Sequence, residues 1–176
     1  IELGVLTTDN GRITVSNTAG EVVETFTSVD MSLAWPATTA PLSIEAEGIW
    51  RGVQARLGFS TQSARDFFRD TASATRLSVE SEAAALTFEG SASFGTMAFA
   101  DGTIGFSTPS MQALMSLLGT EVPPGRALGS VALEGPVRIA QRRIRFEGLQ
   151  IDIDGNDGTG VLEIALDGDN RLPAIT

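Results

Sequence analysis

The residues best suited to chemistry in this chain are a run of oxygen-bearing side chains near its C-terminus. The segment DIDGNDG brings Asp152, Asp154, Asn156 and Asp157 together, and Glu163 lies eleven positions after Asp152. This spacing approaches that of an EF-hand calcium loop, which requires glycine at its sixth position and helices on both sides. Here the sixth position is Asp157 and the flanking segments have the pattern of strands. We therefore interpret the run as a hairpin turn, with incidental calcium binding as the alternative.

Two pairs of glutamates could in principle serve acid–base catalysis. Glu45 and Glu47 are two positions apart, as are Glu80 and Glu82, so each pair shares one face of a strand. A glycosidase needs two carboxylates that oppose each other across a cleft. Pairs on the same face are more typical of charges that point into solvent, and we interpret them in this way.

Two further patterns could bind phosphate. Three glycines between residues 155 and 160 have the spacing of a partial phosphate loop, but no helix follows to supply its N-terminus. Four arginines form a local basic cluster, and an arginine group can clamp a phosphate head group. Alternating arginines also mark the solvent side of a strand, so both interpretations stay open for this cluster: Arg138, Arg142, Arg143 and Arg145.

The residue types that are missing restrict the chemistry further. The 176 residues include no histidine, cysteine, tyrosine or lysine, and all 12 basic residues are arginine. These absences remove the usual general base, thiolate catalysis, disulfides and Schiff-base chemistry. We therefore predict that the protein is not an enzyme and has no catalytic residues, no metal site and no cofactor.

Charge and composition limit the partners. The net charge of −10 and the pI near 4.4 argue against nucleic acid and against broad adhesion to anionic membranes. Apolar residues make up 42% of the chain, enough for a core, and no apolar run is long enough for a transmembrane helix. We expect a single β-rich domain over residues 1–176, cut from a longer chain.

Alternating apolar and polar residues dominate the sequence and predict roughly a dozen strands, mostly antiparallel. The first hairpin is expected to join Ile1–Thr7 to Arg12–Ser16 through Asp9-Asn10-Gly11, and another turn is expected at Arg51-Gly52. The predicted fold class is therefore mainly β. It is a long, curved sheet, shaped like a groove or an open sandwich, with one or two short helices.

The closing strand pair has the clearest one-sided pattern. Ile144 and Phe146 share one parity, and Leu149 and the following apolar residues share the other, with Gly148 at the change of phase. A bulge at Gly148 would keep all of these side chains on one face and bend the strand. The candidate lining residues of this face are Ile144, Phe146, Leu149, Ile151, Ile153, Leu162, Ile164 and Leu166.

Two segments have helical patterns. Residues Ser63–Asp70 form a short candidate with an aromatic pair. The clearer candidate is Pro109–Leu118, with Thr108 as its N-cap and Gly119 as its C-cap. Its apolar stripe would either pack on the sheet as core or cap the end of an apolar groove, where methionine adapts to variable contents. The stripe consists of Met111, Leu114, Met115 and Leu118.

From Ser107 to Thr176 the order of elements resembles the closing segment of AsmA-like proteins. That segment has a strand ending in an l.l.ldg pattern, a glycine-rich turn, an amphipathic strand and a short return with an rP.l.G.L pattern. The matching elements here are Leu149, Ile151, Asp154-Gly155, Gly160–Asp167 and Arg171-Leu172-Pro173. The preceding TPSMQALMSLLG, Pro123-Pro124-Gly125 and GSVALEGPVRI also follow the family's order, and the upstream GRITVSNTAG and LSIEAEGIWRG match it loosely.

The resemblance implies a fold, a place and an activity. AsmA-like proteins of Gram-negative bacteria are held in the inner membrane by one N-terminal helix, absent from this chain, and project into the periplasm. They are related to bridge-like lipid-transfer proteins with a repeating β-groove, and they are tied to phospholipid traffic and outer-membrane biogenesis. The expected function is therefore a periplasmic groove module that binds or conducts phospholipid between the membranes.

One alternative is a non-catalytic scaffolding domain, with a closed and fully packed sandwich, that assists outer-membrane protein assembly. A carboxylate glycosidase is a more distant alternative. An open sheet of this kind would also expose edge strands, so we expect edge-to-edge self-association of the isolated chain.

Overall fold

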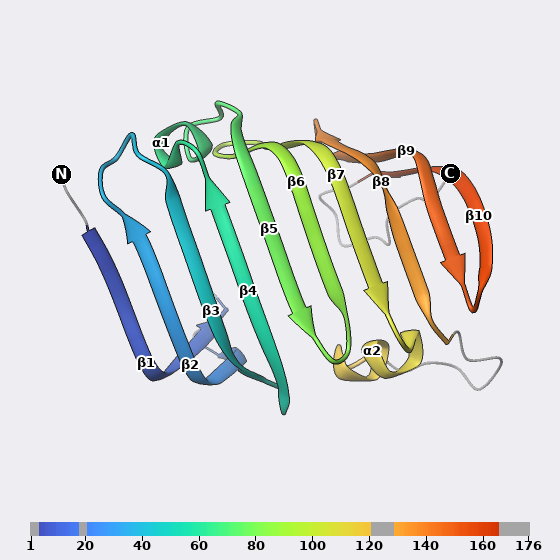
Figure 1. Cartoon of the computed structure of the whole chain (residues 1–176), viewed down its shortest axis with the longest axis horizontal. Coiled ribbons are helices and arrows are strands. Elements are labelled where there is room, and N and C mark those ends of the chain that lie inside the picture. The colour runs from blue at the N-terminus through green and yellow to red at the C-terminus, as the bar shows by residue number, and fades with distance from the viewer. Residues whose placement is uncertain (1–3, 18–20, 121–128, 166–176) are drawn as a thin grey trace.

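The computed structural model describes residues 4–17, 21–120 and 129–165, and strands dominate this part of the chain (Figure 1). The strands are β1 (Gly4–Ser16), β2 (Val22–Trp35), β3 (Leu42–Trp50), β4 (Val53–Thr61), β5 (Ser73–Ser81), β6 (Ala85–Phe94), β7 (Ala98–Thr108), β8 (Val131–Ala140), β9 (Arg143–Ile153) and β10 (Asn156–Ala165). The two helices are α1 (Ala64–Phe67) and α2 (Met111–Leu117).

The strands form one open antiparallel sheet of ten strands, in which the spatial order is the chain order from β1 to β10. This confirms the mainly β, antiparallel fold. Within the described residues no second sheet packs against the first, so the strands form a single layer rather than the closed sandwich considered as an alternative. The strands β1 and β10 form the two edges of the sheet.

The predicted hairpin at Asp9-Asn10-Gly11 is wrong. The strand β1 continues through these residues and pairs along its length with β2, which has 14 residues. The register shifts between Thr8 and Gly11, and Asn10 has a positive φ of 49°, as expected for a bulge rather than a turn. A long partner strand thus absorbs the turn-like residues, which is one reason for fewer strands than predicted.

Tight turns explain the consecutive strand order. The turns β3–β4, β8–β9 and β9–β10 each have two residues with positive φ, the geometry that matches the twist of antiparallel strands. The expected turn at Arg51-Gly52 is the first of these, and the last is Asp154-Gly155. The acidic run near the C-terminus therefore contains a hairpin turn, as interpreted from the sequence.

The helix α2 begins two residues later than the sequence suggested. Its N-cap is Ser110, whose side chain accepts a hydrogen bond from the backbone N–H of Ala113. Thr108, the expected cap, ends β7 and is buried, and its hydroxyl donates to the carbonyl of Ala83. The strand thus extends to the residue predicted as the N-cap. The prediction that Gly119 ends the helix was right, because Gly119 follows the helix with a φ of +78°.

The expected first helix also forms, but only over the four residues of α1. Its N-cap is Ser63, which accepts from the backbone N–H of Asp66. Ala64 is fully buried where α1 lies against the ends of β5 and β6. Small residues on these strands and on β7 leave space for the helix there, among them Ser73, Thr75, Gly90, Ala92 and Ala100.

Candidate functional site: the apolar face of the sheet

The candidate residues of the closing strand pair lie on one face of the sheet. Ile144 of β9 is paired with Ile164 of β10, and Phe146 is paired with Leu162. On the other side of β9, Ile151 faces Leu133 of β8, and side chains in paired positions of an antiparallel sheet share a face. Seven of the eight predicted residues therefore share this face. The eighth, Leu166, lies outside the described residues.

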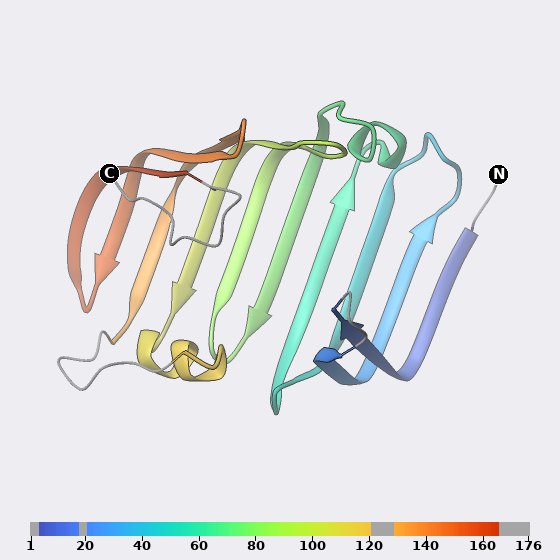
Figure 2. The same cartoon turned by 180° about the vertical axis from the view of Figure 1, so that it is seen from behind.

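Gly148 produces the phase change that the sequence indicated. It has a φ of +64°, and the pairing of β9 with β8 and with β10 shifts register beside it. As a result Leu149, immediately after the bulge, turns to the same face as Phe146 and is buried to 2% exposure. Gly135 on β8 makes room for it, because a Cβ there would lie 3.0 Å from the Cα of Leu149. The strands β9 and β10 also bend along their length (Figures 1 and 2).

The apolar face extends far beyond the closing strand pair, which the sequence reasoning did not include in the site. The paired positions of the middle strands form two continuous rows across the sheet. The alternation of apolar and polar residues in each strand indicates which side chains share a face. The two rows can be identified only when the pairing register of neighbouring strands is known. The first row is Leu33, Ile44, Phe59, Leu77, Phe88 and Ile104, and the second is Met31, Ala46, Leu57, Val79, Leu86, Phe106, Leu133 and Ile151.

Most side chains in these rows are only partly buried. Leu57, in the centre of the second row, is 37% exposed, and its neighbours in both rows are half-buried. In a closed core such residues would be almost fully covered. Within the described residues, the strands contact chiefly their neighbours in the sheet, and α1 lies against the ends of β5 and β6 and reaches Phe59 of β4 through Phe67. Among the described residues, no other element therefore covers the middle of the face.

One end of the face is bounded by segments that come from three places in the sequence. The end of β1 and the start of β2 project from the sheet toward the viewer in Figure 2, and α2 lies at the same end of the strands. Arg51, in the β3–β4 turn, joins these parts. Its guanidinium donates to the carboxylate of Glu24 on β2. It also donates to the carbonyl of Leu117 at the end of α2, at a distance of 2.6 Å.

The same cluster is reinforced by aromatic contacts. The indole of Trp50 donates to Glu24 at 2.7 Å and stacks against Phe26, and Arg51 lies over the indole ring. The hydrogen bonds from Arg51 and then from Trp50 hold the pKa of Glu24 below its ordinary range. The ion pair therefore keeps the carboxylate charged at neutral pH, and we name this arrangement the Glu24–Arg51 clamp.

The predicted capping helix lies at the clamped end of the strands. None of its residues is buried, and Leu118 is 49% exposed. The helix is thus more exposed than a fully packed core helix, and its role in capping the face stays a prediction. The residues Met111, Leu114 and Met115 are half-buried, and the hydrogen bond from Arg51 to Leu117 fixes the C-terminal end of the helix.

The opposite face of the sheet is polar and is covered with ion pairs. Arg56 pairs with Glu47, and Arg76 pairs with Glu89 at 2.7 Å. Three arginines of the basic cluster also have carboxylate partners: Arg138 with Asp101, Arg143 with Glu163 and Arg145 with Glu147. Because these cations are paired with carboxylates of the chain, the cluster does not form the free phosphate clamp that the sequence left open.

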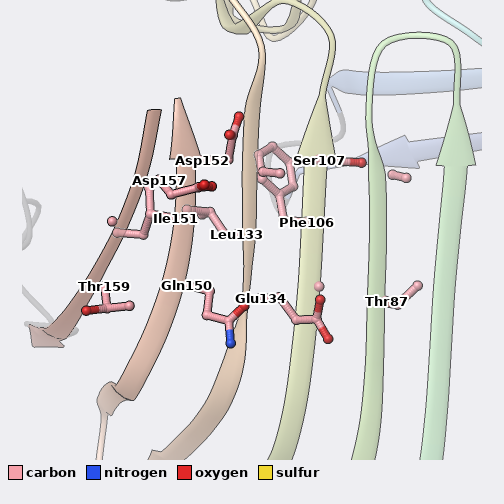
Figure 3. Close-up of a pocket in the computed structure, with 14 residues that line it drawn as sticks. Thr87, Phe106, Ser107, Leu133, Glu134, Gln150, Ile151, Asp152, Asp157 and Thr159 are labelled. Atoms are coloured by element: carbon pink, nitrogen blue, oxygen red, sulfur yellow. The ribbon is translucent and has the colours of Figure 1, made fainter. Parts of the chain in front are cut away.

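A shallow hollow lies on the polar face above β6–β10 (Figure 3). Its labelled side chains include Glu134, Gln150, Asp152, Asp157 and Thr159, which come from three neighbouring strands. Asp152 and Asp157 occupy paired positions on β9 and β10. Among the described residues, however, no group of three or more acidic side chains is arranged to hold a metal ion.

The turn that approached an EF-hand loop uses its oxygens for local structure. Asp152 accepts from the backbone N–H of Gly155, and Asp154 accepts from the backbone N–H of Gly129. These hydrogen bonds tie the β9–β10 turn to itself and to the segment before β8. The arrangement agrees with the interpretation as a turn.

Comparisons with known proteins give no relative: no family model, no curated protein and no solved structure matches this chain. In the described residues no helix has the length and apolar character needed to cross a bilayer. The function must therefore be argued from the two faces of the sheet and from what bounds them.

Proposed function

We propose that this chain is a β-groove module that binds the acyl chains of phospholipids along the apolar face of its sheet. It works without catalysis, in the manner of the AsmA-like proteins that its C-terminal part resembles. In this proposal the module lies in the periplasm of a Gram-negative bacterium, in a protein tethered to the inner membrane. There it conducts lipid toward the outer membrane.

The observation that carries the proposal is the continuous apolar face with an open middle. Neighbouring strands lie about 4.8 Å apart, so ten strands give a face roughly 40 Å wide. One leaflet of a bilayer has a hydrocarbon thickness of about 15 Å, so the face could hold more than one acyl tail. Contact with apolar side chains stabilises a tail by about 25 cal/mol per Å² of buried surface, without directional contacts.

The polar face supports the proposed lipid binding because it differs from the apolar face in composition. Four of its arginines pair with carboxylates on neighbouring strands, and its further charges keep that side compatible with water. A sheet with one apolar and one ion-paired face has one side for an apolar ligand and one for solvent. A scaffold with both faces covered would not need this division.

The proposal can be tested by native mass spectrometry and lipid extraction of the purified 176-residue chain. Phospholipid should co-purify with the protein, and a fluorescent fatty acid should bind to the delipidated protein. Ile151→Asp and Ile164→Asp should each reduce binding about tenfold, because a buried charge is poorly tolerated next to an acyl chain.

Gln150→Asp is the matched control, because Gln150 precedes Ile151 on the same strand and points to the opposite face. It should retain lipid. A well-folded chain that co-purifies without lipid and does not bind the fatty acid would overturn the proposal. Circular dichroism of each variant separates loss of binding from loss of the fold.

A further inference from the structure

A group of large apolar side chains is exposed at the end of the strands opposite the clamp. Phe68 follows α1, Phe94 ends β6, and Met97 lies in the β6–β7 turn; they are 50%, 65% and 65% exposed. In both views the β6–β7 turn and α1 lie next to each other at one end of the sheet (Figures 1 and 2). We name Phe68, Phe94 and Met97 the end patch.

The end patch is held in place by Asp70. The carboxylate of Asp70 accepts from the backbone N–H of Met97 at 3.1 Å, and hydrogen bonds from Met97 and Thr96 hold its pKa below the ordinary range. Gly95 lies so close that a Cβ would be 2.7 Å from the backbone nitrogen of Asp70. The residues that follow α1 and the β6–β7 turn are thus fixed to each other, and their apolar side chains are presented together.

The cations beside the end patch differ from most others in the chain. Arg65 and Arg69 are both exposed, and neither has a carboxylate within ion-pair distance among the residues that the structure describes. By contrast, the arginines of the β3–β4 turn and of the polar face pair with carboxylates. Of the two acidic residues nearby, Asp66 lies in α1, and Asp70 directs its carboxylate to the backbone of the β6–β7 turn.

A line of aromatic rings connects the end patch to the apolar face. Phe59, in the first apolar row, contacts Phe67 edge-on with ring centroids 5.4 Å apart. Phe67 in turn contacts Phe68 with centroids 5.0 Å apart. An apolar chain leaving the face at this end would therefore meet aromatic carbon up to the exposed ring of Phe68.

We propose that the end patch docks onto the surface of an anionic phospholipid bilayer. The apolar side chains enter the boundary between head groups and acyl chains, and Arg65 and Arg69 meet the phosphates. Exposed aromatic and methionine side chains flanked by unpaired cations are the chemistry by which proteins lie on such surfaces. Docking of the end patch does not depend on the proposed function. Only the passage of acyl chains along the aromatic rings rests on it.

The patch favours a bilayer over a second copy of the chain by its charges. Two copies with a net charge of −10 each repel one another, and in a contact between two end patches the arginines of one copy would face those of the other, so a second patch offers few anionic partners. A phosphate surface supplies many. The local pair of cations acts within a Debye length of the head groups, about 8 Å at physiological salt, whereas distant acidic residues are screened.

The test is flotation of the full chain with vesicles of phosphatidylcholine containing phosphatidylglycerol, and with vesicles of phosphatidylcholine alone. The wild type should float with the anionic vesicles. Phe68→Ser combined with Met97→Ser should lower the bound fraction about tenfold, and Arg65→Ser combined with Arg69→Ser should lower it by a similar factor. Met97→Ser alone, on an exposed turn, should have a smaller effect in the same direction.

Val161→Ser is the matched control, because Val161 is also 65% exposed but lies on the edge strand β10. It should bind vesicles like the wild type. A wild type that stays with the soluble fraction, or a patch variant that changes the oligomeric state while vesicle binding persists, would overturn the inference. Fatty-acid binding in vesicle-free solution reports on the proposed function separately, since the patch variants keep the apolar rows.

Discussion

Glu24 and Arg51 are 27 positions apart in the sequence, and their side chains form an ion pair at one end of the sheet. Arg51 also reaches the last turn of α2, so that a single side chain joins two strands, a turn and a helix. A cation at the C-terminal end of a helix also interacts favourably with the helix dipole. The clamp therefore couples the bent edge of the sheet to the helix at the end of the apolar face.

The clamp predicts a stability that depends on pH. Because the pKa of Glu24 is lower in the folded protein than in the unfolded chain, its stabilisation is present above the ordinary pKa of glutamate and is lost as the pH falls through the folded value. Glu24→Gln should therefore lower the Tm at neutral pH, and the difference from the wild type should shrink as the pH falls below the ordinary pKa of glutamate and disappear below the folded pKa. Thermal unfolding across this range checks it.

The control for this prediction is Glu89→Gln. Glu89 pairs with Arg76 on the polar face, where both side chains are largely exposed, and exposed pairs contribute little. Its effect on the Tm should be smaller than that of Glu24→Gln at neutral pH. Equal effects of the two substitutions would show that the clamp is an ordinary surface pair.

Gly148→Ala should destabilise the protein through its backbone alone. A Cβ at Gly148 meets nothing within 4 Å, but the φ of +64° is costly for any residue with a side chain. The expected loss is about 1–2 kcal/mol, measured by urea unfolding. Gly160→Ala, across the sheet on β10, also meets nothing and should change stability by less than about 0.5 kcal/mol. A neutral Gly148→Ala would contradict the bulge.

Gly90→Ala should be damaging for a different reason. Gly90 and Gly102 are paired on β6 and β7, and a Cβ at Gly90 would lie 2.3 Å from the carbonyl oxygen of Asp101. Because backbone atoms cannot rotate away, the sheet must deform, at a cost of about 3 kcal/mol. Gly58→Ala is the comparison, since its Cβ would meet only the hydroxyl of Ser78, which can turn aside. Urea unfolding should rank Gly90→Ala as clearly the less stable.

Leu77→Asp tests whether the whole face, rather than the closing strand pair, holds the acyl chain. Leu77 lies on β5 in the first apolar row, four strands from β9. If the rows act as one surface, Leu77→Asp should weaken fatty-acid binding about tenfold. Ser78→Asp on the polar face should leave it unchanged. Binding that persists in a folded Leu77→Asp protein would confine the site to β9 and β10.

The sequence predicted those parts of the site that depend on alternation within one strand. The shared face of Ile144, Phe146 and Leu149 follows from a period of two and one glycine at the phase change, and both are local signals. The turn at Asp154-Gly155 was equally local. The structure therefore confirmed the one-sided strand pair, while its role in lipid binding stays a prediction.

What the sequence did not predict depends on partners far along the chain. The Asp9-Asn10-Gly11 segment has the composition of a turn, and only the length of β2 makes it a bulge. Thr108 has the chemistry of an N-cap, but pairing with Val131 of β8 keeps it in a strand. The end patch and the clamp join residues from separate hairpins, and no spacing in the sequence brings these residues together.

The order of the strands has a mechanical consequence. Every strand is bound to its neighbours in the chain, and the first and last strands lie at opposite edges of the sheet. A force applied to the two ends would therefore load one hydrogen-bonded ladder at a time and peel the sheet from its edges, hairpin by hairpin. The Glu24–Arg51 clamp ties the second strand to the helix that follows the seventh, so such a force would have to break this cross-connection before the second strand could separate.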